Sequence, residues 1–285
     1  MRPIEVQGLR KSYGATTAVD GVDLAVEAGE VFALLGPNGA GKTTTVEILE
    51  GHRRRDGGDV RVLGEDPGAA GRRWRARIGV VLQTAADAAE LTVRESVRHY
   101  GGYYPRRRDP DEVIAAVGLE SKAGARVRTL SGGQRRRLDV ALGIVGRPEL
   151  VFLDEPTTGF DPEARRQFWD LIRALAADGT TILLTTHYLD EAEALAGRLA
   201  VLAAGRIVAA GSPATVGGRD RAAAVVTWRD ADGFHEVRTG EPDALVAGLS
   251  GFTGLRVARP TLEDVYLSLI GGAGTDSPST IGATG

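Results

Sequence analysis

The sequence predicts an α/β fold built on a parallel sheet, on the basis of three observations. Continuous apolar runs, typical of strands buried on both faces of a parallel sheet, include residues 29–36, 149–156 and 181–187. Segments with helical patterning separate such runs, as crossover helices do. A glycine-rich phosphate-binding loop follows the first run. With 285 residues, 42% hydrophobic and 26% charged, the chain can bury one large core and a smaller one.

The first part of the chain alternates short strand-like runs with turns. Residues 4–9 and 18–27 are two such runs, and residues 29–36 predict a buried strand. Residues 59–64 and 77–83 predict two further strands. These segments form the first half of the predicted sheet.

Helical patterning becomes stronger in the middle of the chain. From residue 85 to about residue 129 it dominates, and residues 111–119 carry apolar side chains at helix spacing. We therefore expect a helical subdomain at about residues 85–140. Buried strands separated by helices return between residues 150 and 211, as in a parallel sheet with crossover helices.

The pattern changes near residue 211. Two strands around a turn at Asp230–Gly233, a helix, a strand and a final helix follow, at residues 223–239, 242–249, 255–259 and 262–270. We therefore predict a first domain at residues 1–211 and a small α+β domain at 212–270. The tail at 271–285 is rich in Gly, Ser and Thr, has almost nothing to bury, and is expected to be disordered.

The composition argues against several classes of function. The net charge of −3 lacks the basic footprint of a nucleic-acid-binding protein, so no nucleic-acid partner is expected. The chain contains no cysteine, which excludes disulfides, thiolate catalysis and cysteine metal sites. No apolar run is long enough for a signal peptide or a membrane-spanning helix, so we do not expect the chain to cross a membrane by itself.

The stretch GPNGAGKT, residues 36–43, fits the pattern G-x-x-x-x-G-K-[ST] between a predicted strand and a predicted helix at residues 43–51. Backbone N–H groups of the loop can surround a β-phosphate. Lys42 can bridge the β- and γ-phosphates, and the Thr43 hydroxyl can bind Mg²⁺. The alternative is a glycine-rich turn of structural use only, which the strand and helix on either side argue against.

Two acidic residues end a buried strand in ELVFLDEP, where a parallel sheet presents its ligand-binding edge. Asp154 is placed to hold Mg²⁺, directly or through water. Glu155 is the candidate general base, because it lies one residue further and can orient a water in line with a γ-phosphate. A strand end that merely meets solvent is the alternative.

The stretch LSGGQRRRLD at residues 130–139 allows two interpretations. A helix that begins after glycines offers free backbone N–H groups to an anion. An ordinary helix capped by Ser131 is the simpler interpretation, because serine is a common N-cap residue.

Read together, GPNGAGKT, LSGGQ, VFLDEP and TTH resemble, in their order and spacing, the nucleotide-binding subunit of ATP-binding cassette transporters. The resemblance covers about residues 4–215. It implies a P-loop NTPase core whose mixed sheet carries an antiparallel and a helical subdomain, and it implies ATP and Mg²⁺ as ligands. The implied nucleotide-binding residues are Tyr13, Gly36, Pro37, Asn38, Gly39, Ala40, Gly41, Lys42, Thr43 and Thr44.

The resemblance also implies roles for single residues. Tyr13 matches the aromatic residue that stacks on adenine, and Gln83 matches the glutamine that senses Mg²⁺ and contacts the permease. Asp161 matches the loop that joins two active sites, and His187 matches the switch histidine that contacts the γ-phosphate. The implied catalytic residues are Glu155, His187 and Gln83, and the implied metal ligands are Thr43, Gln83 and Asp154.

In the family that this chain resembles, the signature turn of one subunit caps the γ-phosphate bound to the other. The corresponding residues are Leu130, Ser131, Gly132, Gly133 and Gln134. The resemblance therefore implies a homodimer or a heterodimer of ATPases. Two departures, Thr84 after the glutamine and Phe160 in the dimer loop, concern the permease contact and the dimer seam rather than a phosphate ligand.

The end of the chain, RPTLEDVYLSLIGG, resembles a subgroup of drug and antibiotic exporter ATPases of the daunorubicin-resistance type. We therefore expect an ATPase subunit that powers a separate exporter permease from the cytoplasmic face of the membrane. An importer subunit stays open. A soluble cassette protein acting on ribosomes or DNA is disfavoured by the single cassette and the short segment between Gln83 and Ser131. A nucleotide-binding module without turnover would lack Glu155 or His187.

Overall fold

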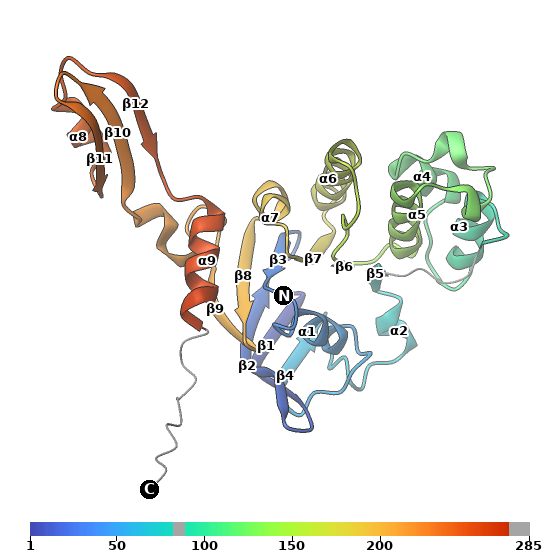
Figure 1. Cartoon of the computed structure of the whole chain (residues 1–285). Coiled ribbons are helices and arrows are strands. Elements are labelled where there is room, and N and C mark those ends of the chain that lie inside the picture. The colour runs from blue at the N-terminus through green and yellow to red at the C-terminus, as the bar shows by residue number, and fades with distance from the viewer. Residues whose placement is uncertain (82–88, 274–285) are drawn as a thin grey trace, which may run out of the picture.

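The computed structural model describes residues 1–81 and 89–273. Its centre is a six-stranded sheet in the order β5-β6-β7-β3-β8-β9 (Figure 1). The strands are β3 (Val31–Leu35), β5 (Ile78–Val81), β6 (Leu150–Asp154), β7 (Thr181–Thr186), β8 (Arg198–Ala203) and β9 (Arg206–Gly211). Every pair is parallel except β8–β9. The predicted α/β class is confirmed.

The edge strand β9 is antiparallel and makes the central sheet mixed, as the resemblance implied, although the pattern at residues 150–211 by itself predicted strands of a parallel sheet. Ala204 and Gly205 connect β8 to β9, and both have positive φ, 47° and 77°. A two-residue turn with two positive φ values makes a hairpin, because a parallel connection needs a long crossover. The Gly205 carbonyl then accepts from Asp20 N–H at 2.8 Å, and the Gly205 N–H donates to the Ala40 carbonyl at 3.1 Å, so the hairpin supports the phosphate-binding loop.

A second, antiparallel sheet covers one side of the central sheet. It contains β1 (Ile4–Tyr13), β2 (Thr16–Val26) and β4 (Gly57–Val62) in the order β2-β1-β4. Its apolar side chains share a buried cluster with helix α1 (Lys42–Leu49) and with one face of the central sheet. Trp74 of the short helix α2 (Arg72–Arg75) closes this cluster and donates from its indole N–H to the Val62 carbonyl at 2.8 Å.

The helical subdomain lies beyond β5 at one end of the molecule (Figure 1). It contains α3 (Val93–Gly101), α4 (Pro110–Ala116), the 3₁₀ turns η1 (Glu120–Lys122) and η2 (Val127–Thr129), and α5 (Gly132–Ile144). Helix α3 begins with a capping box in which Thr92 and Glu95 satisfy each other's backbone N–H groups. Helix α5 packs on α3, α4 and β5. The helices α6 (Pro162–Ala177) and α7 (Leu189–Leu195) join β6 to β7 and β7 to β8.

The segment after residue 211 is divided between two places. Strands β10 (Ala224–Asp230), β11 (Gly233–Thr239) and β12 (Thr253–Ala258), with α8 (Pro242–Ala247), form a sheet that projects from the end opposite the helical subdomain (Figure 1). Helix α9 (Leu262–Ala273) instead packs on α7, β8 and β9. The 3₁₀ helix η3 (Val216–Arg221) packs on α9 and β9. Residues 274–285, most of the tail predicted to be disordered, lie outside the described residues.

Helix α9 contributes to the core of the cassette. Leu262 and Tyr266 belong to the same buried cluster as Val201 of β8, with exposed fractions of 1%, 9% and 0%. The domain boundary at residue 211 remains a prediction. Strands β10–β12 form a sheet apart from the cassette, whereas α9 packs against the cassette core.

Truncating Leu262 is expected to destabilise the whole cassette. Leu262→Ala should lower the free energy of unfolding by about 2–5 kcal/mol, because it leaves a cavity in the cassette core. The matched control is Leu267→Ala on the same helix, 54% exposed, which should change the free energy by less than about 0.5 kcal/mol. Urea unfolding followed by circular dichroism measures both. Equal effects of the two substitutions would contradict the packing of α9 on the cassette.

Within the ranges 1–81 and 89–273, the structure contains no helix that is both long enough and apolar enough to span a membrane.

Candidate active site

The candidate site is formed where β3, β6 and β7 end. Gly36 follows β3, Glu155 follows β6 and His187 follows β7, so residues far apart in sequence meet at one edge of the sheet. Their positions follow from the parallel register, in which Leu35 lies beside Thr186 and Asp154 beside Thr185. Ligands of open α/β sheets bind at this edge.

The phosphate-binding loop turns from β3 into α1 and leaves the start of the helix without a side-chain cap. The N-cap residue is Gly41, with φ 104°, and no side chain accepts a hydrogen bond from the first turn. The residues at this turn therefore have backbone N–H groups available to an anion, and the helix dipole favours negative charge there.

Three positions of the loop require glycine, each for its own steric reason. A Cβ on Gly36 would come within 2.3 Å of the Leu202 carbonyl oxygen, and a Cβ on Gly41 within 2.3 Å of the Ala18 carbonyl oxygen. Gly39 has open space around it, but its φ of 80° is strained for other residues. The loop is thus pressed against β8 and β2 while Pro37, Asn38 and Gly39 remain exposed.

The Lys42 ammonium is held inside the loop. The side chain is 5% exposed, and Nζ donates to the carbonyls of Gly36 at 2.7 Å and Pro37 at 3.2 Å. Burial lowers the pKa of Lys42, while the charges of Glu155 and Asp154 oppose that shift. The Lys42 Nζ lies 3.9 Å from Glu155 Oε1. The ammonium is therefore positioned between the loop and the acidic pair.

The acidic pair at the end of β6 is fixed by β7. The Thr185 hydroxyl donates to an Asp154 carboxylate oxygen, and it accepts from the Glu155 N–H at 3.1 Å. The Glu155 N–H also donates to the Thr185 carbonyl at 3.1 Å. Thr185 is buried and thus sets both residues relative to the sheet.

His187 and Glu155 face each other. His187 Nδ1 lies 3.2 Å from Glu155 Oε1, the same oxygen that faces Lys42. The structure thus brings together Lys42, Glu155 and His187, with Asp154 beside them. Such a set can orient a water with a carboxylate next to bound phosphate.

Tyr13 lies at the end of β1, and the residue is 42% exposed. Lys11 Nζ lies 5.5 Å from the ring centroid, and Arg53 Cζ lies 5.2 Å from it. The ring is accessible for stacking by an adenine, in competition with these two cations.

Ser131 caps α5, as the simpler of the two sequence interpretations holds. Its hydroxyl accepts from the Gln134 N–H at 3.3 Å, and the Gln134 side-chain oxygen accepts from the Ser131 N–H at 3.1 Å. The turn is nevertheless open, because Ser131 and Gly132 are exposed and a Cβ on Gly132 would meet nothing within 4 Å. Capping and anion binding by this turn are therefore compatible.

Asp161 also caps a helix. Its carboxylate accepts from the N–H groups of Glu163 at 3.0 Å and Ala164 at 2.8 Å at the start of α6. Gln83, predicted to bind Mg²⁺ and to contact the permease, lies outside the described residues, as does Thr84. The structure describes all the other candidate residues named from the sequence.

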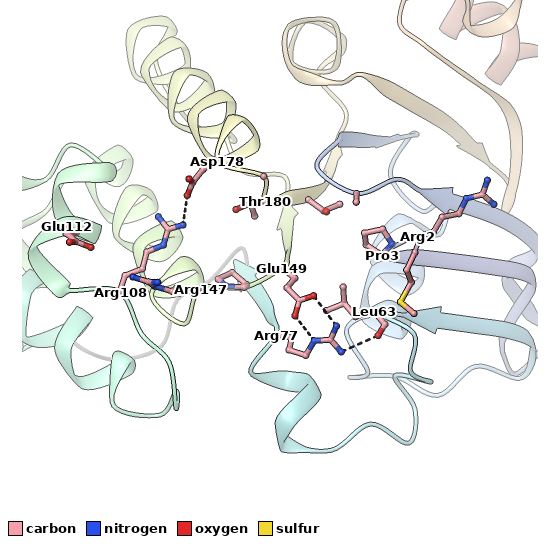
Figure 2. Close-up of a pocket in the computed structure, with 15 residues that line it drawn as sticks. Arg2, Pro3, Leu63, Arg77, Arg108, Glu112, Arg147, Glu149, Asp178 and Thr180 are labelled. Carbon is pink, nitrogen blue, oxygen red and sulfur yellow. Dashed lines mark hydrogen bonds and ion pairs between the residues drawn. The ribbon is translucent and has the colours of Figure 1, made fainter.

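A cavity of about 640 Å³ lies at the opposite edge of the central sheet. Its lining includes Glu149 and Thr180, which precede β6 and β7 (Figure 2). Two of its arginines are paired with carboxylates that also line it, Arg77 with Glu149 at 2.7 Å and Arg108 with Asp178 at 2.9 Å. This cavity lacks the phosphate-binding loop and the acidic pair, so the carboxyl edge of the sheet is the candidate site.

Comparison with known proteins agrees with this geometry. Residues 19–158 match the family model described as ABC transporter. The chain is 40% identical over 295 residues to the Nod factor export ATP-binding protein I of Burkholderia lata, across 94% of this chain and 97% of that protein. The chain belongs to the ABC transporter family. It is an ABC ATP-binding protein, and members of this kind hydrolyse ATP.

Two more comparisons extend this result. The chain is 50% identical over 216 residues to the daunorubicin/doxorubicin resistance ATP-binding protein DrrA of Streptomyces peucetius. The aligned residues make up 74% of this chain and 66%, just under two thirds, of that relative. Among solved structures, the ADP conformation of an ATP-binding cassette of an ABC transporter matches with a TM-score of 0.67 at 25% identity, over 74% of this chain and 91% of that chain.

A further structure, an ATP-binding subunit of an ABC transporter, matches with a TM-score of 0.71 over 93% of this chain and 98% of that chain. At 24% identity it supports the fold alone. A match over 93% of this chain extends beyond residues 1–211 into the segment that follows them.

Three residues near the ABC site were missed by the sequence analysis. Thr185 lies in the TTH motif, whose histidine alone was assigned. Glu50 is buried at the end of α1, and its pKa is raised to about 8, chiefly by burial and further by the charges of Asp154 and Glu47. Arg136 follows the signature motif. Only the spatial approach of these side chains to Asp154 and Glu155 indicates a connection with the site.

Proposed function

We propose that this ABC ATPase is the nucleotide-binding subunit of an exporter and works as a dimer against a separate transmembrane permease. The main observation behind this proposal is the cluster of Lys42, Glu155 and His187 beside a helix that begins without a side-chain cap. The cargo class is proposed to be a drug, antibiotic or lipid-like molecule. Support comes from the names of two relatives, which refer to Nod factor export and to daunorubicin/doxorubicin resistance.

We propose that ATP binds with its phosphates in the loop from Gly36 to Thr44 and its adenine on Tyr13. Lys42 would exchange its two loop carbonyl contacts for phosphate oxygens. Glu155 would accept a proton from the attacking water, and His187, 3.2 Å from Glu155, would fix that carboxylate and contact the γ-phosphate.

The donors suit Mg²⁺ as the accompanying ion. Thr43 offers a hydroxyl at the first turn of α1 and Asp154 offers a carboxylate at the end of β6, and Mg²⁺ prefers oxygen ligands that leave room for phosphate and water. Bound there, Mg²⁺ would neutralise charge that develops on the phosphates. Gln83 completes the proposed set. Asp154 would be oriented by the Thr185 hydroxyl, which already donates to it.

We propose that each active site is shared between two subunits, with residues 130–134 of one chain closing on the γ-phosphate of the other. The openness of Gly132 and the exposure of Ser131 support this arrangement. Asp161 would lie in the seam between subunits. The partner is a second copy of this chain or a different ATPase. The subunit would sit at the cytoplasmic face of the membrane, held there by the permease.

Transport into inverted membrane vesicles tests the direction of transport. Vesicles that contain this chain and its proposed permease should accumulate daunorubicin or a lipo-oligosaccharide when ATP is added. Vesicles with Glu155→Gln should not, because hydrolysis is stalled. The permease alone is the second control. ATP-dependent loss of preloaded cargo from the vesicles, in place of uptake, would indicate an importer.

A further inference from the structure

The signature helix α5 carries a buried arginine that reaches the end of β6. Arg136 is 7% exposed and lies five residues after the N-cap Ser131. Its Nη2 donates to the Asp154 carbonyl at 2.7 Å, and its Nε donates to the Pro156 carbonyl at 3.1 Å. The guanidinium therefore contacts the backbone on both sides of Glu155.

The backbone between these two contacts is strained. Glu155 has φ 43°, a left-handed conformation that is uncommon for residues other than glycine. The following residue is Pro156, and a proline further disfavours any conformation of the preceding residue outside the extended region. Such a conformation persists where the surroundings fix it. Thr185 holds it from β7 and Arg136 holds it from α5.

The charge of Arg136 is balanced within the protein. Burial lowers the pKa of Arg136, and the charges of Asp139, one turn further along α5, Asp154 and Glu191 oppose that shift. Burial raises the pKa of Asp139 to about 6, against the effect of Arg136 and Arg135. A buried guanidinium with a nearby counter-charge can form two strong, directed hydrogen bonds to carbonyl groups.

We infer that Arg136 is a positioning residue for the general base: it holds the strained backbone of Glu155 so that the carboxylate faces Lys42 and His187, and it transmits movements of α5 to that carboxylate. This inference rests on the proposed role of Glu155. Ser131 and Arg136 lie on one rigid helix, so closure of the signature turn on a partner's nucleotide moves the guanidinium as well. Hydrolysis would thus depend on the position of the helical subdomain through two hydrogen bonds.

The test is the ATPase activity of the full chain, in the assembly that hydrolyses ATP. Arg136→Met should lower kcat by about 10- to 100-fold, because small displacements of a catalytic group have effects of this size. KM for ATP should stay within about twofold, since the phosphate-binding loop is untouched. The matched control is Arg137→Met, which should leave kcat unchanged, because the Arg137 guanidinium contacts Gln167 of α6 rather than the backbone around Glu155.

Arg136→Lys distinguishes positioning from folding. It keeps the charge and one contact but loses the planar fork, so kcat should lie between those of the wild type and Arg136→Met. It also decides the matter if Arg136→Met fails to fold. A kcat in Arg136→Lys equal to that of the wild type would overturn the inference, and so would an Arg136→Met variant that loses ATP affinity in proportion to kcat.

A double-mutant cycle separates this inference from the proposed function. If Arg136 acts through the carboxylate, adding Arg136→Met to Glu155→Gln should change the residual turnover by less than about twofold. A further loss equal to that of the single substitution would overturn the inference alone. Wild-type turnover in Glu155→Gln by itself would instead overturn the role of Glu155, and this inference with it.

Discussion

Lys42→Ala is expected to abolish nucleotide binding, whereas Glu155→Gln is expected to preserve binding and stall hydrolysis. The two side chains lie 3.9 Å apart, and in the proposed mechanism they act at different steps. Lys42 supplies positive charge to the ground-state phosphates, and its removal leaves the loop carbonyls of Gly36 and Pro37 facing the nucleotide. Glu155 acts on the attacking water, so the neutral amide should lower kcat by about 10²- to 10⁴-fold.

Two control variants make this comparison specific. Glu149→Gln changes the carboxylate at the opposite end of β6, which pairs with Arg77, and should retain wild-type turnover. Lys122→Ala removes an exposed lysine of the helical subdomain and should bind ATP normally. Calorimetric ATP titration and steady-state ATPase assays measure the two steps. A Glu155→Gln protein with the wild-type rate would show that another group activates the water.

The Glu155→Gln variant is also expected to trap the dimer. If ATP binding closes two subunits and hydrolysis opens them, the stalled variant should elute as a dimer with ATP and as a monomer without it. Lys42→Ala should elute as a monomer in both conditions. An ATP-independent elution volume in Glu155→Gln would argue against nucleotide-driven closure.

Mixing two inactive variants is expected to restore ATPase activity. Ser131→Arg should bind ATP through its own Lys42 but fail to hydrolyse it, because the bulky cation occupies the space of the partner's γ-phosphate. Lys42→Ala fails earlier, at binding. In a mixed dimer one site joins the two damaged halves, while the other joins an intact phosphate-binding loop to an intact signature turn. That second site should recover part of the wild-type rate.

The loss of the cap must be controlled in this experiment. Ser131 caps α5, so replacing it with a residue that does not cap, such as Ala, costs about 1 kcal/mol of stability. Ser131→Ala loses the same cap without adding bulk, and it should melt at the same temperature as Ser131→Arg. Activity is then titrated across mixing ratios of Ser131→Arg and Lys42→Ala. No recovery at any ratio is the result that a self-contained site in each chain predicts.

A crosslink tests the shared site even if the dimer turns over only when both of its sites can hydrolyse ATP. In that case a mixed dimer stays inactive although its geometry is correct. The chain contains no cysteine, so a pair introduced at Gly132 and Asn38 would be the only thiols present. ATP-dependent disulfide formation between two chains is expected in the Glu155→Gln background. Crosslinking to the same extent with and without ATP would contradict an active site that is shared between two chains and closed by ATP.

The sequence predicted the local structure around the candidate site. The phosphate-binding loop, the acidic pair and the signature turn each consist of adjacent residues with a fixed steric or electrostatic requirement. Gly36 and Gly41 are examples, because a Cβ at either would collide with a carbonyl oxygen. The α/β class and the family are confirmed. The roles of single residues in catalysis remain predictions that the geometry supports.

The sequence by itself determined which segments become the main strands and helices and where the glycine-rich loop lies, because periodicity, glycines and caps act over a few residues. Only the tertiary structure decided which distant side chains meet. It brought Thr185 to Asp154, placed α9 on the cassette core and set Arg136 of the signature helix against the backbone around Glu155. Such contacts join separate elements, and their partners are fixed by the packing of the whole sheet and its helices rather than by any local pattern.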